Sequence, residues 1–205
     1  MSTKRAIERL GLFAVPVFRG VLESFGEKRD ELLALVNGER AKTVGLSVSN
    51  RGGYRSHDAL HAVDAPGAQY LTRAVLEFAV RALRETGMTF ADTDLVLSSS
   101  WANVDGPGCF HSPHSHYPAH WSGVLYVSVA GCAAEDPSVR DGKIELLNPL
   151  PAPQAFHAPT GVTFTPKDGM ILLFPGVLSH LVHPHRAQVE RVSIAFNLDV
   201  LPRRR

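Results

Sequence analysis

The second half of the chain consists of short apolar segments separated by glycine and proline, and this pattern limits the folds that the chain can adopt. Segments of this length suit strands, whereas helices need longer periodic stretches. Turn pairs such as Asp141-Gly142 and Asp168-Gly169 separate some of them. We therefore expect a double-sheet jelly roll or a related barrel, a shape that can hold a ligand in its mouth. The predicted strands are residues 95–104, 122–129, 143–147, 162–164, 169–174 and 190–198.

The first half of the chain adds two predicted helices and one strand. Apolar residues recur at helical spacing in residues 22–36 and again in 69–84, and Gly38 and Gly87 supply stop signals. Residues 10–18 are apolar and favour a first strand. The 205 residues fit one domain, 1–205, that is mainly β with flanking helices (α+β).

The composition limits the classes of partner that the chain is expected to bind. The net charge is +1 and basic residues are scattered apart from a terminal Arg-Arg-Arg, so we expect neither nucleic acid nor membrane binding. The N-terminus lacks the apolar core of a signal peptide, and no apolar run approaches the ~20 residues of a membrane span. Two cysteines fit a reduced, cytoplasmic chain. The oligomeric state stays open, and a homodimer is compatible with the sequence.

Histidines cluster within residues 111–120, while residues 106–134 contain no acidic side chain. Imidazole is the commonest protein ligand for several transition metals. His114 and His116 are two residues apart, the spacing at which neighbours on a strand point to one face and can hold one ion. His180 follows a buried-strand pattern and a Pro-Gly turn, so we expect it to supply a third metal ligand.

An open-sided metal site for oxygen chemistry needs three protein ligands on one face and free positions on the other. Arg191 and Ser193 begin the last predicted strand, where alternation points both side chains the same way. A guanidinium beside a hydroxyl suits a carboxylate, which it can hold with two hydrogen bonds. We expect such a carboxylate close to the metal if this strand lies beside the one near His180. A surface salt bridge between Arg191 and Glu190 or another acid is the alternative.

Several motifs occur in one order along residues 49–197. Asn50-Arg-Gly-Gly-Tyr-Arg-Ser56 and Trp101-Ala-Asn103 come first, followed by His114-Ser-His116-Tyr-Pro-Ala-His120-Trp-Ser-Gly-Val-Leu-Tyr-Val, Phe174-Pro-Gly-Val-Leu-Ser-His180 and Arg191-Val-Ser-Ile-Ala-Phe-Asn197. This order resembles the Fe(II)/2-oxoglutarate-dependent oxygenases. It is most similar to a small bacterial branch with an HxH pair before a Ser-Gly-Val-x-Tyr strand.

The resemblance implies a double-stranded β-helix of the cupin-like kind that uses Fe(II), 2-oxoglutarate and dioxygen. It assigns His114 and His180 to the two metal-binding histidines of the family, and Arg191 with Ser193 to the motif that binds the distal carboxylate of 2-oxoglutarate. The implied reaction is the hydroxylation of a small-molecule or amino-acid-like substrate, with release of succinate and carbon dioxide.

His116 departs from the family, because most members have Asp or Glu at this place. A neutral imidazole there leaves the metal site with one negative charge fewer. Either three histidines bind the metal, or an acid such as Asp105 or Glu135 approaches it. We favour the three histidines.

Other site residues are assigned from their neighbourhood. Asn103 and Tyr126 are expected to bind 2-oxoglutarate or to orient a histidine, with ordinary strand packing as the alternative. The Gly-Gly pair in residues 49–56 suits a mobile loop, so we expect Tyr54 and Arg51 or Arg55 to contact the substrate. His120 is a further candidate for substrate binding. Three histidines receive no defined role: His111, His183 and His185.

Two other functions remain open from sequence. One is a cupin-like three-histidine metalloenzyme that does not use 2-oxoglutarate, and the other is a noncatalytic jelly-roll module with a structural metal. Arg191 and Ser193 discriminate against the first, because an enzyme without the co-substrate needs no carboxylate anchor. Structural metal sites fill their coordination positions, so an open site would argue against the second.

Overall fold

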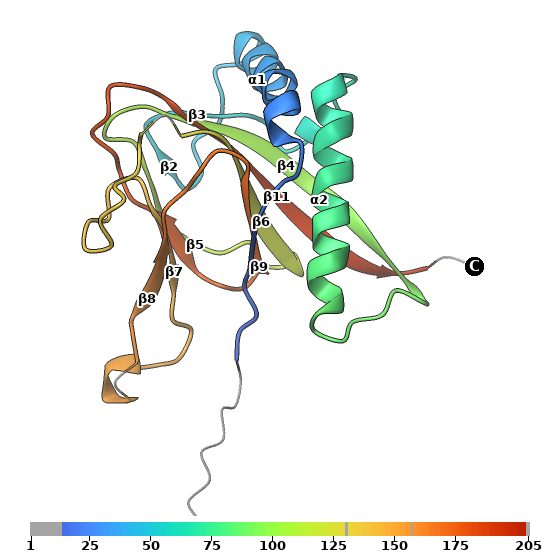
Figure 1. Cartoon of the computed structure of the whole chain (residues 1–205), viewed down its shortest axis with the longest axis vertical. Helices are drawn as coiled ribbons and strands as arrows, with labels where there is room; N and C mark the ends of the chain where they lie inside the picture. The colour runs from blue at the N-terminus through green and yellow to red at the C-terminus, as the bar shows by residue number, and fades with distance from the viewer. Residues whose placement is uncertain (1–13, 130, 157, 204–205) are drawn as a thin grey trace, which may run out of the picture.

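Two antiparallel sheets pack face to face, and two helices cover the outer side of the larger sheet (Figure 1). The computed structural model describes residues 14–129, 131–156 and 158–203. Its elements are β1 (Phe18–Val21), α1 (Phe25–Lys42), β2 (Asn50–Arg51), β3 (Tyr54–Arg55), η1 (Leu60–Ala62), α2 (Pro66–Arg84), β4 (Thr93–Asp105), β5 (Phe110–His114), β6 (Trp121–Ser128), β7 (Ile144–Leu147), η2 (Pro153–Phe156), β8 (Gly161–Phe164), β9 (Met170–Pro175), β10 (His180–Val182) and β11 (Arg191–Pro202).

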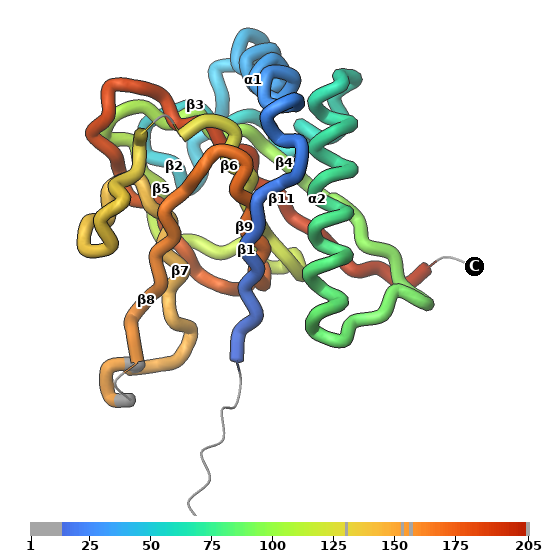
Figure 2. Tube along the Cα trace, viewed as in Figure 1, coloured from blue at the N-terminus to red at the C-terminus, as the bar shows by residue number. Residues whose placement is uncertain are grey.

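The strand order explains how distant segments meet. The larger sheet runs β1-β9-β6-β11-β4-β3, and the smaller sheet runs β2-β5-β10-β7-β8. The N-terminal strand β1 lies along β9 at one edge of the larger sheet (Figure 2). This is the mainly β jelly roll with flanking helices that the sequence predicts.

Alternation along the central strands sorts their side chains into two cores. On β6, Leu125 and Val127 pack against the helices, whereas Val124 and Tyr126 point between the sheets. Strand β9 divides its side chains in the same way. Both faces of these strands are covered, which explains why they are apolar throughout. On β11, Val192 and the residues that alternate with it face the helices, so the intervening Arg191 and Ser193 face the interior.

The helices agree with their predicted positions but differ in length. Helix α2 buries its apolar stripe, including Leu71, Val75 and Ala79, against the larger sheet. Helix α1 continues past Gly38 to Lys42. Its last turn is stabilised by Arg40, which donates two hydrogen bonds of 2.8 and 2.9 Å to Glu190, and by cations that complement the helix dipole. None of the described helices is long and apolar enough to cross a membrane.

The predicted strand pattern was wrong at several places. Residues 10–13 of the predicted first strand lie outside the described residues, and 14–17 are not in a strand. Sequence reasoning missed β2, β3, β5 and β10. These strands are short, and β5 carries histidines and a proline in place of the β-branched residues that signal a strand.

Candidate metal centre

Three histidines meet at one end of the space between the sheets. Their ligand atoms all lie within 4.8 Å of one another. His114 ends β5 and His180 begins β10, and these two residues are directly paired across neighbouring strands. The distance between their ring centroids is 4.3 Å. Strand pairing therefore explains why residues so distant in sequence share one site.

His116 reaches the site from a loop and not from a strand. Strand β5 ends at His114, so strand alternation, on which the sequence prediction relied, does not place His116. Instead, the backbone N–H of His116 donates to the carbonyl of Gly176 over 2.7 Å, and the N–H of Gly176 donates to the carbonyl of His120 over 3.0 Å. A Cβ at position 176 would clash with the Ala119 carbonyl oxygen, so this close backbone approach requires glycine.

Backbone carbonyls fix the tautomers of two of the three histidines. Nδ1 of His114 lies 2.7 Å from the Ser112 carbonyl oxygen, and Nδ1 of His180 lies 3.0 Å from that of Leu178. A carbonyl only accepts, so both Nδ1 atoms carry the proton and both Nε2 atoms present a lone pair. Metal-binding histidines use the same arrangement. Nε2 of His114 accepts from the Ser49 hydroxyl at 3.3 Å.

Burial keeps these imidazoles neutral. Desolvation lowers the pKa of His180 to about 3, and the neighbouring His114 acts in the same direction. Desolvation likewise lowers the pKa of His116 to about 4 and reduces that of His114. Neutral imidazole is the form that binds a metal, so the three nitrogen donors fit a transition-metal ion without first losing protons.

A narrow cavity of about 40 Å³ extends from the histidines toward β4 and β11. It brings together the residues predicted to bind metal and co-substrate, which are His114, His116, His180, Asn103, Tyr126, Arg191 and Ser193. Burial raises the pKa of the Tyr126 hydroxyl, so this group is a neutral hydrogen-bonding group. The buried Oδ1 atom of Asn103 has no hydrogen-bond partner among the described residues.

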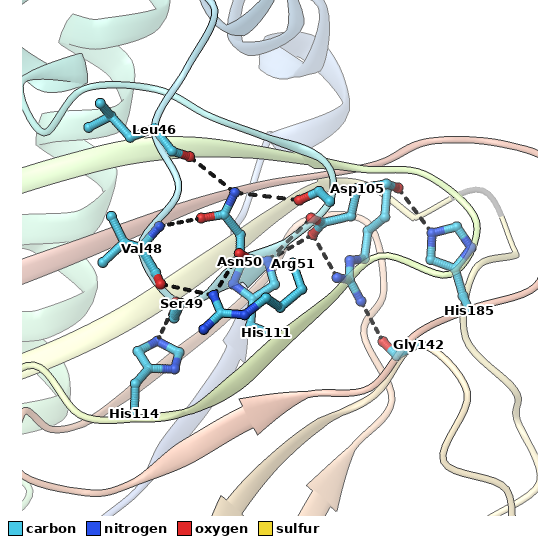
Figure 3. A network of polar contacts seen from close by, with 12 residues as sticks. Leu46, Val48, Ser49, Asn50, Arg51, Asp105, His111, His114, Gly142 and His185 are labelled. Carbon is cyan, nitrogen blue, oxygen red and sulfur yellow. Dashed lines mark hydrogen bonds and ion pairs between the residues drawn. The ribbon is translucent and has the colours of Figure 1, made fainter.

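Arg191 lines the cavity beside Asp105, with which it is paired, and Figure 3 shows that Asp105 lies at the end of this region away from His114. Both side chains are 1% exposed. The guanidinium donates from Nη2 to Asp105 Oδ2 over 2.7 Å and from Nη1 to the Gly142 carbonyl over 2.9 Å. Its buried Nε has no partner among the described residues. Glu190 instead pairs with Arg40, so the predicted alternative is wrong for Glu190, and the acid that Arg191 does pair with, Asp105, is buried and not on the surface.

The unpartnered Nε and Asn103 Oδ1 provide a test of co-substrate fit. Buried polar groups are normally hydrogen-bonded, so two orphaned atoms on cavity-lining residues indicate room for a polar ligand. A donor on a guanidinium suits a carboxylate oxygen. The residues at this end therefore fit a 2-oxo acid, and those at the other end fit a metal ion.

Neither of the alternative acids belongs to the group formed by His114, His116 and His180. The carboxylate of Asp105 binds Arg191 and His111, and the exposed Glu135 lies 3.7 Å from Lys167. The described His, Cys, Asp and Glu residues form one possible metal-binding group, and it contains neither acid.

The residues predicted to contact substrate are more scattered. Tyr54 faces the helix side of the larger sheet, where its hydroxyl lies 3.2 Å from that of Thr43. The exposed Arg51 donates to the carbonyls of Val48 and Asn50. The structure places neither side chain on the cavity.

His120 and Arg55 also lie apart from the cavity lining. His120 is exposed and lies 2.9 Å from Asp199. Arg55 is buried, pairs with Asp58 and covers the Trp101 ring at 4.6 Å. That indole lies 5.3 Å from the ring of His116, and the charge of Arg55 adds to burial in lowering the pKa of His114 and of His116.

Sequence reasoning gave no role to several other residues of the cavity wall, among them Ser49, Trp101 and His111, and it considered Asp105 only as a possible metal ligand. A signal existed for two of them. Trp101, Asn103 and Asp105 alternate along β4, so assigning Asn103 to the interior also assigns its two neighbours.

Comparison with known proteins agrees with this geometry. Residues 99–197, just under half of the chain, match the family described as "Putative 2OG-Fe(II) oxygenase". This part of the chain therefore resembles the 2-oxoglutarate/Fe(II) oxygenases. Members of this family are oxidoreductases that use Fe(II) and 2-oxoglutarate. The matched residues include the three histidines, Asp105 and Arg191. Curated protein sequences provided no match.

Solved structures of such oxygenases share the fold. A prolyl-4-hydroxylase from Pseudomonas putida is 17% identical, with a TM-score of 0.61 over 93% of this chain and 94% of that one. HygX from Streptomyces hygroscopicus, with nickel and 2-oxoglutarate bound, is 15% identical, with a TM-score of 0.58 over 89% of this chain and 81% of that one. The viral collagen prolyl hydroxylase vCPH from Paramecium Bursaria Chlorella virus-1, in a 2-oxoglutarate complex, is 13% identical, with a TM-score of 0.54 over 89% and 94% of the two chains.

Proposed function

We propose that this oxygenase, as one domain of residues 1–205, hydroxylates a small-molecule or amino-acid-like substrate. In this proposal His114, His116 and His180 hold Fe(II). The observation that carries the proposal is the cavity itself, which has one buried and two half-buried neutral imidazoles at one end and a guanidinium with an unpartnered Nε at the other.

In this reaction the residues of the chain position the metal and the co-substrate and exclude water. His114 and His180 each aim Nε2 at the metal because a carbonyl holds the opposite nitrogen. Arg191 and Ser193 would hold the distal carboxylate of 2-oxoglutarate, with Tyr126 and Asn103 as further hydrogen-bonding groups. Buried walls limit access of water to the site. When bound, Fe(II) and 2-oxoglutarate supply the oxidising chemistry with dioxygen.

The first experiment tests the co-substrate. We expect anaerobic Fe(II)-loaded protein to develop a visible metal-to-ligand charge-transfer band when 2-oxoglutarate is added. Arg191→Met should keep the metal and need more 2-oxoglutarate for the same band, whereas the surface variant His120→Ala should behave like the wild type. Confirmed iron occupancy without a band would sink the proposal and favour a metalloenzyme independent of 2-oxoglutarate.

A second experiment tests hydroxylation. Small metabolites and free amino acids are screened for those that increase succinate formation, and each active compound is analysed by mass spectrometry. We expect the product to gain one oxygen atom. Stimulated succinate formation with a desaturated or cyclised product would keep the oxygenase assignment and refute hydroxylation.

A further inference from the structure

The anchor end of the cavity already contains a carboxylate. Asp105 ends β4 directly opposite Arg191 on β11. Its Oδ2 accepts from Arg191, and both carboxylate oxygens lie 3.2 Å from Nε2 of the buried His111, which donates to them (Figure 3). The backbone carbonyl of Asp105 also accepts from Nε2 of His185 over 3.0 Å. Asp105 is therefore fixed on several sides.

The Asp105 carboxylate is ionised in this environment. Burial alone would raise its pKa, but the His111 hydrogen bond and the charge of Arg191 outweigh burial and lower the pKa of Asp105. A stable negative charge therefore lies on the wall of the cavity, beside the guanidinium predicted to bind the co-substrate.

Counting formal charges shows what this carboxylate replaces. The three histidines are neutral, and Arg191 and Asp105 cancel, so these five side chains carry no net charge. An aspartate in place of His116 would put a negative charge at the metal end. Here His116 removes that charge from the metal end, and Asp105 places one at the anchor end.

We propose, on the basis of the function above, that Asp105 is a specificity-determining residue with which the distal carboxylate of the co-substrate must share Arg191. Two of the five N–H groups of Arg191 are used by Gly142 and Asp105, and among the described residues Nε is the guanidinium nitrogen without a partner, so it can donate to the incoming carboxylate. Two carboxylates beside one guanidinium repel each other. Asp105 therefore weakens the binding of a 2-oxo acid with a distal carboxylate relative to one without it. Half-saturation by 2-oxoglutarate then requires a higher concentration than it would without Asp105.

The test compares two probes of equal chain length. Mn(II)-loaded wild type and Asp105→Asn are titrated by calorimetry with 2-oxoglutarate and with 2-oxopentanoate, which has a methyl group in place of the distal carboxylate. The asparagine keeps an oxygen for Arg191 but removes the charge. We expect 2-oxoglutarate to bind about tenfold more tightly to the variant, because a like charge at close range is removed. Binding of 2-oxopentanoate should change less than about twofold.

Glu190→Gln is the matched control. It removes the same formal charge from the residue next to Arg191, but on the surface, where Glu190 pairs with Arg40. We expect this variant to bind both probes as the wild type does. If Asp105→Asn fails to fold, Asp105→Ser removes the charge with a smaller side chain and should shift the same ratio in the same direction.

The outcomes separate the two proposals. An unchanged ratio, or weaker 2-oxoglutarate binding in a folded Asp105 variant, would refute the specificity role and leave the proposed function standing. Metal-loaded wild type that binds neither probe would instead overturn the proposed function.

Discussion

The two ends of the cavity are both buried, but they avoid the cost of buried charge in opposite ways. At the metal end, imidazoles from the β5–β10 pair and a loop are desolvated, and their lowered pKa values keep them neutral. At the anchor end, Arg191 and Asp105 from the β11–β4 pair stay charged because they neutralise each other. One end is thus poised to gain a cation, whereas the other already holds a matched ion pair.

The largest expected effect is at the metal end. His180→Ala removes one of three nitrogen donors, and we expect metal affinity to fall by at least about 100-fold, the upper end of the loss that an outer-shell change causes. Competition with a chromophoric chelator measures this affinity. His120→Ala removes a nearby exposed histidine and should leave the affinity unchanged. Unchanged metal binding by His180→Ala would contradict the ligand assignment.

Breaking the ion pair should affect stability and not metal affinity. Arg191→Met leaves the buried Asp105 without its cation, and we expect the free energy of unfolding to fall by about 3–5 kcal/mol. The double variant Asp105→Asn/Arg191→Met should regain part of this loss, because no charge is then left unpaired.

Denaturant unfolding measures both variants, and an exposed pair provides the control. Arg40→Met breaks the pair with Glu190, whose side chain is 49% exposed, and should cost about 1 kcal/mol or less. If Arg191→Met and Arg40→Met lowered the free energy of unfolding equally, burial would not determine how much the Arg191–Asp105 pair contributes to stability.

Local sequence patterns predicted one residue at each end of the cavity. The Pro-Gly turn points to His180, the alternation along residues 191–197 points to Arg191, and both His180 and Arg191 line the cavity. The partner of Arg191 had no such signal, because it depends on the pairing register of β11 with β4, whose residues are far apart in sequence. His116 shows a different limit. Its position depends on backbone contacts with Gly176, which no short-range periodicity encodes.

Lowering the pH should destabilise the metal end of the cavity, where the imidazoles are desolvated and neutral. His180 and His116 have folded-state pKa values of about 3 and about 4, below the ordinary 6.5, so the unfolded chain binds more protons between these limits. Stability of the metal-free protein is therefore fully present above about pH 6.5 and falls toward pH 4. Each histidine contributes up to about 1.4 kcal/mol per pH unit.

Denaturant unfolding at a series of pH values checks this slope. The double variant His116→Gln/His180→Gln should give a flatter profile between about pH 6.5 and pH 4, since glutamine does not titrate there. A wild-type profile as flat as that of the variant would mean that the two imidazoles are not held neutral by burial.

The smallest expected effect concerns the hydroxyl of Ser49, which lies 3.3 Å from Nε2 of His114. In the metal-free protein this hydroxyl donates to the lone pair that the metal requires, so binding must break the contact. Ser49→Ala removes the competitor, and we expect metal affinity to rise by about twofold to tenfold, the net value of an ordinary hydrogen bond. The exposed Ser115→Ala is the control. Each end of the cavity would then contain a protein group that competes with the ligand for that end. At the histidines the metal displaces the weakly bound hydroxyl of Ser49, and at Arg191 the co-substrate shares the guanidinium with the strongly bound carboxylate of Asp105. Weaker metal binding by Ser49→Ala would break this parallel, because it would make Ser49 a support for the metal and not a competitor.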